Sequence, residues 1–338
     1  MPRVSVVMPV FNNGEWLAEA IGSVRAQSLQ EFELIIIDDG STDQTEIIIA
    51  NAARDDARIR TARQDHLGVA AALNRGNALA QSPVIARMDG DDIADSDRLR
   101  KQLAFLEAHP SVAAVGSWAH VVDERSRRTG ELRPETESSV LRSLLPKTNP
   151  FVHSSMMLST EVVRGVGGYR AGLEGAEDYD LWLRISERAQ LANLPEFLLS
   201  YRRHSASASA TATQRQLLSA RLARLSAAER RASRPDFVDT LGVPAQFAAL
   251  RRRDELRAIA ELYELLGRSA NERFAARELR ALGGADLDHA ERKAAQHWLK
   301  DLLESQQDWV IRSAALYWLL LLHPPRGLSL AWSALRGR

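Results

Sequence analysis

Short apolar runs rich in β-branched residues constrain the fold of this chain most strongly. Val4 to Val10, Phe32 to Ile37 and Val84 to Met88 are almost uniformly apolar. Such runs are typical of parallel strands, because both faces of a parallel sheet are covered. Between the runs, apolar residues recur at helical spacing over residues 16–24, 46–53 and 70–80. The alternation predicts an α/β fold with a parallel sheet flanked by helices.

The pattern becomes less regular beyond Pro110. We expect strands at residues 112–122 and 151–158, a polar loop at 125–137 and helices at 98–107 and 177–189. Residues 201–213 are rich in serine and alanine and predict a linker. Strong helix formers predominate from Gln214 onward. The predicted organisation is therefore an α/β domain over residues 1–210 and a helical C-terminal region over residues 211–338.

The formal net charge of zero is the sum of two unequal parts. Residues 212–338 contain 21 Lys and Arg against 15 Asp and Glu, so the preceding residues carry a net charge of −6. A basic helical segment can face nucleic acid, an anionic lipid or an acidic partner, although solvated arginines on helices give the same composition. We expect no nucleic-acid partner. The chain has no cysteine, which excludes disulfides and cysteine metal sites and fits a reducing compartment.

The N-terminus and the most apolar stretch bear on localisation. The chain turns apolar directly after Met1 and has neither a basic n-region nor a cleavage signature, so we expect a cytoplasmic protein. Ala314 to Leu322 is too short to cross a bilayer as a helix. Tryptophan, tyrosine and arginine residues around this stretch would suit peripheral contact with the inner face of a membrane. The other interpretation is a terminal helix that packs on its own domain.

Three acidic stretches follow or adjoin the predicted elements: IIIDDGSTD at 35–43, ARMDGDD at 86–92 and GAEDYDLWLRI at 175–185. The first two come where a predicted strand ends. In an open parallel sheet such ends share one rim, where ligands bind. Carboxylate oxygens suit Mg2+ or Mn2+, which in turn binds phosphate oxygens. The alternative, and the commoner use of a lone Asp-x-Asp, is a solvated or capping carboxylate.

Asp178 lies in the third stretch, after a glycine-rich loop. A carboxylate there is a candidate general base for an attacking hydroxyl. The alternative is a charge that stabilises a helix N-terminus through the helix dipole. The spacing alone leaves both open.

Five segments, in order, resemble the motifs of family-2 glycosyltransferases with the GT-A fold: VSVVMPVFN, FELIIIDDGSTD, LGVAAALNRGNALAQSPVIARMDGDD, DRLRKQLAFLE and GGYRAGLEGAEDYDLWLRI. The resemblance covers about residues 2–209. It implies a GT-A-type, Rossmann-like α/β fold with a mixed, mainly parallel sheet flanked by helices. It also implies an inverting hexosyl- or N-acetylhexosaminyltransferase that uses a nucleotide-diphosphate sugar, with a UDP-sugar favoured, and Mn2+ or Mg2+. The implied acceptor is a glycan or a lipid-linked molecule, in surface polysaccharide or glycan synthesis.

The resemblance also assigns substrate-binding positions, which are Pro9, Phe11, Asn12, Asp39, Asn74, Asp89 and Glu177. The residues of the first loop and Asp39 would contact the base and ribose of the nucleotide. Asp89 would face the ribose and the sugar, and Glu177 would lie on the acceptor side.

The metal ligands and the base follow from the same match. Asp91, together with Asp89, would ligate the metal, and Asp178 matches the catalytic base of the family. His204, in YRRHSASAS, matches a position where some relatives have a histidine near the metal or the diphosphate. A neutral imidazole can ligate such an ion, whereas a plain surface histidine is the alternative.

Three other classes of function compete with this interpretation. A nucleotidyltransferase would usually have a glycine- and lysine-rich phosphate loop after its first strand, but MPVFNNGEW contains no lysine. A dinucleotide-dependent dehydrogenase would need G-x-G-x-x-G after a strand, which is missing from the sequence. A non-catalytic sugar-nucleotide or scaffold protein of the same fold would not need Asp39, Asp91 and Asp178, and only a turnover assay excludes it.

Overall fold

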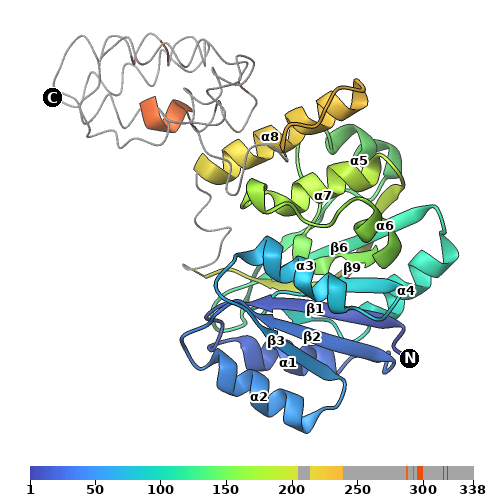
Figure 1. Cartoon of the computed structure of the whole chain (residues 1–338), viewed down its shortest axis with the longest axis vertical. Helices are drawn as coiled ribbons and strands as arrows, with labels where there is room; N and C mark the ends of the chain where they lie inside the picture. The colour runs from blue at the N-terminus through green and yellow to red at the C-terminus, as the bar shows by residue number, and fades with distance from the viewer. Residues whose placement is uncertain are drawn as a thin grey trace. The chain divides into compact units, whose positions relative to one another are not determined.

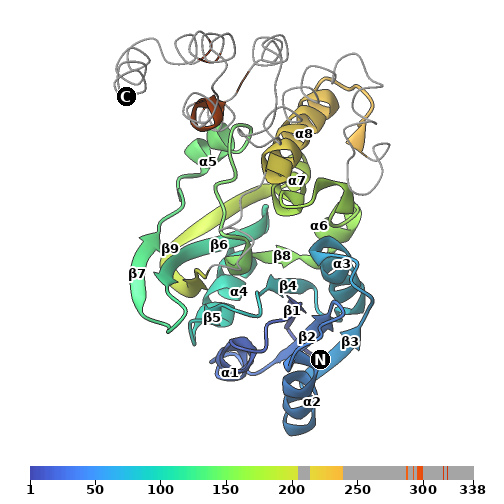
Figure 2. The same ribbon diagram turned by 90° about the vertical axis from the view of Figure 1, so that its left-hand side faces the viewer.

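The computed structural model describes residues 1–204 and 214–238, with Leu287, Arg292, residues 295–299, Ala315 and Trp318. Contacts divide the chain into one compact unit of Met1–Thr211 with Ala220–Phe237, and another of Ala212–Ser219 with Val238–Arg338. Figures 1 and 2 show the helices and strands of the described residues. Most of the expected helical region, including most of the apolar stretch at 314–322, lies outside the described residues. The domain boundary at residue 210 stays a prediction.

Nine strands of the described residues form one sheet in the order β3-β2-β1-β4-β8-β6-β9-β5, with β7 on β6. Their bounds are β1 Val4–Val10, β2 Phe32–Asp38, β3 Ile59–Arg63, β4 Val84–Arg87, β5 Ile93–Ala94, β6 Val112–Val122, β7 Arg128–Leu132, β8 Met157–Ser159 and β9 Gln190–Arg202. The strands β3, β2, β1 and β4 are mutually parallel. Strand β8 then runs antiparallel to both β4 and β6, while β6 and β9 are parallel. The expected mixed sheet is confirmed, with its parallel half at the N-terminus.

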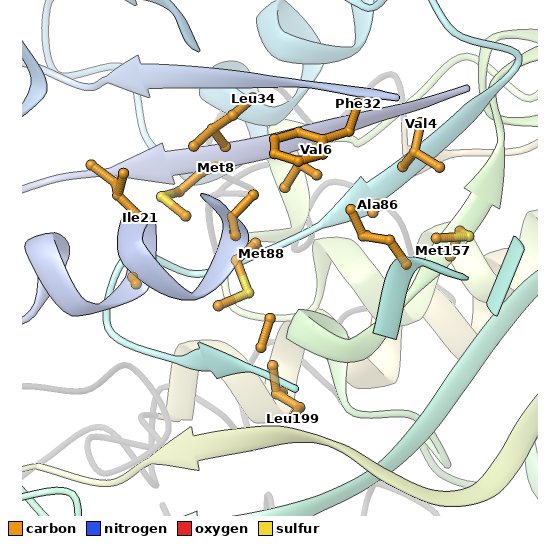
Figure 3. Close-up of a cluster of buried hydrophobic side chains, with 14 of the residues drawn as sticks. Val4, Val6, Met8, Ile21, Phe32, Leu34, Ala86, Met88, Met157 and Leu199 are labelled. Carbon is orange, nitrogen blue, oxygen red and sulfur yellow. The ribbon is translucent and has the colours of Figure 1, made fainter. Parts of the chain in front are cut away.

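Helices cover both faces of the parallel half. They are α1 Leu17–Arg25, α2 Thr45–Asp55, α3 Val69–Leu79, α4 Arg98–Ala108, α5 Ser138–Leu144, α6 Thr160–Gly165, α7 Glu177–Ser186 and α8 Gln214–Arg231, with short 3-10 turns at His153–Ser155 and Ala171–Leu173. One face of β1 and β2 packs on α1, α2 and α4. Figure 3 shows this core, where Val6, Met8 and Leu34 gather with Ile21 and Met88. Burial of these side chains fixes the strands whose ends carry the acidic residues.

Helix α3 covers the other face at very short range. Its Gly76 lies directly over β1, and a Cβ added there would lie 2.3 Å from Val7 Cγ1 and 3.5 Å from Ile37 Cγ1. Glycine therefore permits the close approach of this helix to the sheet.

Several elements differ from the expectations. The predicted loop at 125–137 contains β7, a polar strand that pairs with β6. The predicted strand at 151–158 is instead a 3-10 turn followed by the short β8. Strand β9 extends to Arg202, into the expected linker, and the helix before it ends at Ser186. Pro195 concealed this strand in the sequence, and the pairing register of β6 and β9 shifts beside it, between Ser117 and Trp118.

No helix among the described residues is both long and apolar enough to span a membrane.

The packing of α3 predicts that Gly76→Ala destabilises the protein. The added methyl group must displace Val7, and such overpacking costs about 1–3 kcal/mol of unfolding free energy. Gly22→Ala in α1 is the matched control, because a Cβ there meets no atom within 4 Å. Removal of a helix-interior glycine should stabilise by roughly 0.5–1 kcal/mol. Denaturant unfolding of both variants checks this, and equal stabilities would contradict the packing account.

Candidate active site

The loops after β1, β2 and β4 meet at one edge of the sheet, as the sequence predicted. Strand β1 lies between β2 and β4, with Val10 opposite Asp38 and Val7 opposite Arg87. Phe11, Asp39 and Asp89 therefore leave the sheet on the same side. This rim contains the residues that the motif match assigns to the nucleotide and the metal.

The first loop is bonded to the loop after β2. Asn12 donates its backbone N–H to Ser41 Oγ at 2.9 Å, and its Oδ1 accepts from the N–H of Thr42 at 2.8 Å. Its φ of 52° lies in the left-handed region, which asparagine tolerates better than most residues. Pro9 lies within β1, opposite Ile37. The side chain of Asn12 thus fixes the path of the chain where it leaves β1.

Asp39 organises a third loop. Its buried carboxylate accepts the N–H groups of Leu67 and Gly68, both at 2.9 Å, and the amide of Gln64 at 2.8 Å. His66 of this loop stacks on Phe11 with ring centroids 4.0 Å apart. Phe11 and Leu67 are exposed. The loop and Phe11 therefore present an aromatic and apolar rim beside the buried carboxylate.

Three carboxylates crowd the loop after β4. Asp89, Asp91 and Asp92 each offer an oxygen, and these atoms all lie within 4.8 Å of one another. Burial first, and then the charge of Asp91, raises the pKa of Asp89, against the opposing effect of its contact with Arg87. Burial and the charges of Asp89 and Asp91 raise the pKa of Asp92 well above its usual range. A cation would relieve this repulsion.

Arg202 fixes the acidic loop from the end of β9. Its guanidinium is fully buried; Nε donates to the carbonyl of Asp91 at 2.7 Å and Nη2 to Glu19 at 2.6 Å. Its backbone N–H donates to Asp92 Oδ1 at 2.8 Å. Mutual position of the acidic residues therefore depends on a strand that lies far away in the sequence.

His204 follows two residues later and contacts Asp91. Its Nε2 lies 2.9 Å from Asp91 Oδ2, and its ring packs on Trp16 with centroids 4.1 Å apart. The side chain is only 6% exposed, so the alternative of a plain surface histidine is wrong. The structure brings His204 together with the residues predicted to bind metal.

These residues fit a divalent cation. Asp89, Asp91 and Asp92 offer carboxylate oxygens within 4.8 Å of one another, and His204 Nε2 lies 2.9 Å from Asp91 Oδ2. Carboxylate oxygens are hard ligands that suit Mg2+ and Mn2+. Metal dependence and the identity of the ion stay predictions.

Asp178 lies in the first turn of α7. Its Oδ1 accepts the N–H of Tyr179 at 2.6 Å and its Oδ2 accepts the Asn149 amide at 2.8 Å. Burial raises the pKa of Asp178, although both hydrogen bonds oppose that shift. The adjacent Glu177 is buried and accepts the N–H of Gly175 at 2.7 Å. Burial and the charge of Asp178 raise the pKa of Glu177 to about 7.

The buried Tyr169 and the half-buried His153 connect the loop before α7 to the turn before β8. Tyr169 hydroxyl and His153 Nε2 are 3.0 Å apart, and burial together with the charge of Arg87 lowers the pKa of His153. Asn74 bonds both backbone groups of Tyr169, at 2.7 and 2.8 Å. Burial, and then the charges of Asp178, Glu177 and Asp89, raise the pKa of Tyr169, against the charge of Arg87. Tyr169 therefore lies near both the acidic loop and the start of α7.

Most of these residues were predicted from the sequence as site residues, but Arg87, Asn149, Tyr169 and Arg202 were not. Each lies in or beside a segment that drew attention for another reason: Arg87 in ARMDGDD, Asn149 before Pro150, Tyr169 in the glycine-rich loop and Arg202 two residues before His204. A basic residue adjacent to an acidic motif was the one available signal. It could not show which arginine becomes buried.

The raised pKa of Glu177 predicts a pH-dependent effect of Glu177→Gln on stability. The unfolded chain releases this proton near pH 4.5 and the folded chain near pH 7, so wild type loses stability as the pH rises through this window. At pH 8 the glutamine variant should be more stable by roughly 3 kcal/mol. At pH 4.5 the difference should vanish. Thermal unfolding at both pH values measures it, and a difference independent of pH would contradict the account.

Comparison with known proteins identifies the family of this chain. The family model described as glycosyl transferase family 2 matches residues 5–167. EpsE of Bacillus subtilis is 37% identical over 209 residues, which cover 60% of this chain and 74% of that protein. The O-antigen biosynthesis glycosyltransferase WbnJ of Escherichia coli is 31% identical, over 61% of this chain and 82% of its own length.

Solved structures share the fold. TarS of S. aureus in complex with UDP-GlcNAc aligns with a TM-score of 0.57 at 14% identity, over 99% of this chain and 89% of that chain. The mannosyltransferase PcManGT of Pyrobaculum calidifontis, in complex with GDP-Man and Mn2+, aligns with a TM-score of 0.51 at 18% identity, over 97% and 87%. The sequence relatives and the matching family model show that this chain belongs to glycosyl transferase family 2.

Proposed function

We propose that the protein transfers a sugar from a nucleotide-diphosphate sugar to an acceptor hydroxyl with inversion of configuration. The observation that supports this most is that one segment, residues 149–154, contacts both Asp178 and Asp89. Asn149 donates to Asp178 Oδ2 at 2.8 Å, and Ser154 Oγ accepts the N–H of Asp89 at 2.9 Å. A base on one side and diphosphate-binding carboxylates on the other are the two parts that a single displacement needs.

The donor is a UDP-sugar of the hexose or N-acetylhexosamine class in this proposal. Its support is that the fold neighbours TarS and PcManGT were solved with UDP-GlcNAc and with GDP-Man, both nucleotide-diphosphate sugars. Phe11 and the loop held by Asp39 contact the base and ribose, beside Pro9 and Asn12. Asn74 acts through Tyr169, whose backbone it holds.

Asp89, Asp91 and His204 would hold Mn2+ or Mg2+ at the diphosphate. When bound, the ion supplies positive charge that stabilises the leaving diphosphate. Asp92 and Arg202 keep the acidic loop in place. A rigid ligand set of this kind needs little rearrangement when charge develops.

Asp178 takes the proton of the acceptor hydroxyl, and the oxygen attacks the anomeric carbon as the bond to the diphosphate breaks. Its raised pKa makes Asp178 a stronger base than an exposed aspartate. Asn149 orients the carboxylate through the 2.8 Å hydrogen bond to Oδ2. Attack from the face opposite the nucleotide inverts the configuration. Glu177 lies on the acceptor side.

The acceptor in this proposal is a glycan or a lipid-linked molecule, in the cytoplasm or at the inner face of the membrane. WbnJ and the amylovoran biosynthesis glycosyltransferase AmsE of Erwinia amylovora, which is 30% identical over 75% of its length, support a role in polysaccharide assembly. A non-catalytic protein of the same fold is the second candidate, but the half-buried Asp178 with its oriented hydrogen bonds favours an enzyme.

Asp178→Asn should abolish transfer and leave donor binding intact. The amide keeps the shape of the side chain but cannot accept the proton, and loss of a general base lowers the rate roughly 100-fold or more. Turnover of a UDP-sugar and calorimetric titration of UDP with Mn2+ measure the two effects.

Glu174→Gln is the matched control, because this exposed carboxylate lies in the same loop. The control should turn over like wild type. Near-normal transfer by folded Asp178→Asn would exclude Asp178 as the base. Wild type that binds a nucleotide but never turns over any donor would favour the non-catalytic candidate.

A further inference from the structure

A charged network joins α7 to the segment that follows α8. Among the described residues it contains three carboxylates, Asp180, Glu187 and Asp236, and three arginines, Arg170, Arg184 and Arg230. Asp180 is fully buried, and the exposed fraction of each arginine is between 5% and 16%. Such a network is sensitive to the loss of one member, because a buried charge is then left without compensation.

Asp236 is the member that connects the C-terminal segment to the rest. Its Oδ2 accepts from Arg170 Nη2 at 2.7 Å and from Arg230 Nη1 at 2.6 Å, and its Oδ1 accepts from the hydroxyl of Ser226 at 2.7 Å. Arg230 also binds Glu187, just beyond the end of α7, at 2.9 Å. The second half of α8 is thereby fixed to α7, beside which it lies in Figures 1 and 2.

Arg170 carries this connection into the site. Arg170 directly follows the buried Tyr169 of the candidate site. Its Nε lies 3.6 Å from Oδ2 of Asp180, which is two residues after Asp178. Asp180 in turn binds Arg184, which donates to the carbonyls of Val166 and Gly168 at 2.6 and 2.7 Å. The loop and the first turn of α7 are therefore held by the same set of charges.

The glycine-rich loop before α7 depends on these side-chain contacts for a single conformation. Gly167, Gly168 and Gly175 have φ values of 85°, 68° and 80°, so three of its residues adopt a backbone conformation that other residues rarely occupy. Glycines also leave the chain many alternative conformations. Side-chain contacts from outside the loop must select one of them.

We propose that Asp236 is a positioning residue for the general base: it holds Arg170 and, through it, the glycine-rich loop and the first turn of α7 in the conformation that presents Asp178 to the acceptor. This inference rests on the proposed function. It also places the residues up to Phe237 within the catalytic unit, beyond the predicted boundary at residue 210.

Asp236→Asn in the full chain tests the proposal. The amide preserves the volume but removes the charge that both arginines contact, so the loop should open more often. We expect backbone amides of residues 166–180 to exchange hydrogen about tenfold faster. The Kd of UDP with Mn2+ should stay within about twofold of wild type, because the nucleotide end lies on other strands, while donor turnover falls about tenfold or more.

Glu229→Gln is the matched control. Glu229 lies on α8 beside Arg230 and pairs with Arg234 at 2.5 Å. It should change neither the exchange of residues 166–180 nor turnover. If Asp236→Asn does not fold, Ser226→Ala removes only the hydroxyl that donates to Asp236 and should produce the same local pattern at smaller amplitude.

The outcomes separate the two proposals. The positioning role is overturned if hydrogen exchange of residues 166–180 is unchanged in a folded Asp236→Asn variant. If Asp236→Asn does not fold, the same result in Ser226→Ala overturns it. Faster exchange across the whole first unit would also overturn it, because the residue would then act on stability alone. Failure of wild type to bind any nucleotide would instead refute the proposed function, while the exchange data would still report on the network.

Discussion

Mutual repulsion of three carboxylates at the end of β4 is the constraint on which the site depends. Asp89, Asp91 and Asp92 lie close together and partly or fully buried, an arrangement that destabilises the folded chain unless positive charge lies nearby. Arg87 supplies part of this charge by direct contact. Beneath it, the fully buried Arg98 donates to the carbonyl of Arg87 at 2.6 Å. The protein compensates the cluster incompletely, which leaves it suited to a further cation.

The two halves of the sheet position different parts of the candidate site. The parallel strands β1, β2 and β4 end at a common rim, and in the proposed function their loops form the nucleotide end. The antiparallel β8 and the following glycine-rich loop bring Tyr169 and α7 to the other side of the acidic residues. Strand β9 connects the halves, because Arg202 at its end reaches the acidic loop. Donor and acceptor groups can thus be held by elements that pack independently.

The parallel half of the fold was predictable because its strands are buried on both faces and its helices have clear periodicity. Strand β3 was not, since its polar residues belong to an edge strand with only one paired side. Strand β9 was hidden by Pro195, and β7 by its charged residues. For the site, motif order was enough to bring Asp39, Asp89, Asp91 and His204 to one rim. The role of Arg202 could not be read from the sequence, because it depends on contacts with three distant segments.

Calorimetric titration of UDP, GDP and dTDP, with and without Mn2+, into wild type and Asp91→Ala tests the central claim most directly. Asp97→Ala is the matched control, because its half-exposed carboxylate lies six residues away and contacts Ser28 and Arg100 instead of the cluster. The account predicts that one nucleotide, UDP, binds only with Mn2+, that Asp91→Ala loses this binding and that Asp97→Ala retains it. Binding of the nucleotide by Asp91→Ala with unchanged Mn2+ dependence would contradict the assignment of the acidic loop as the metal and diphosphate site.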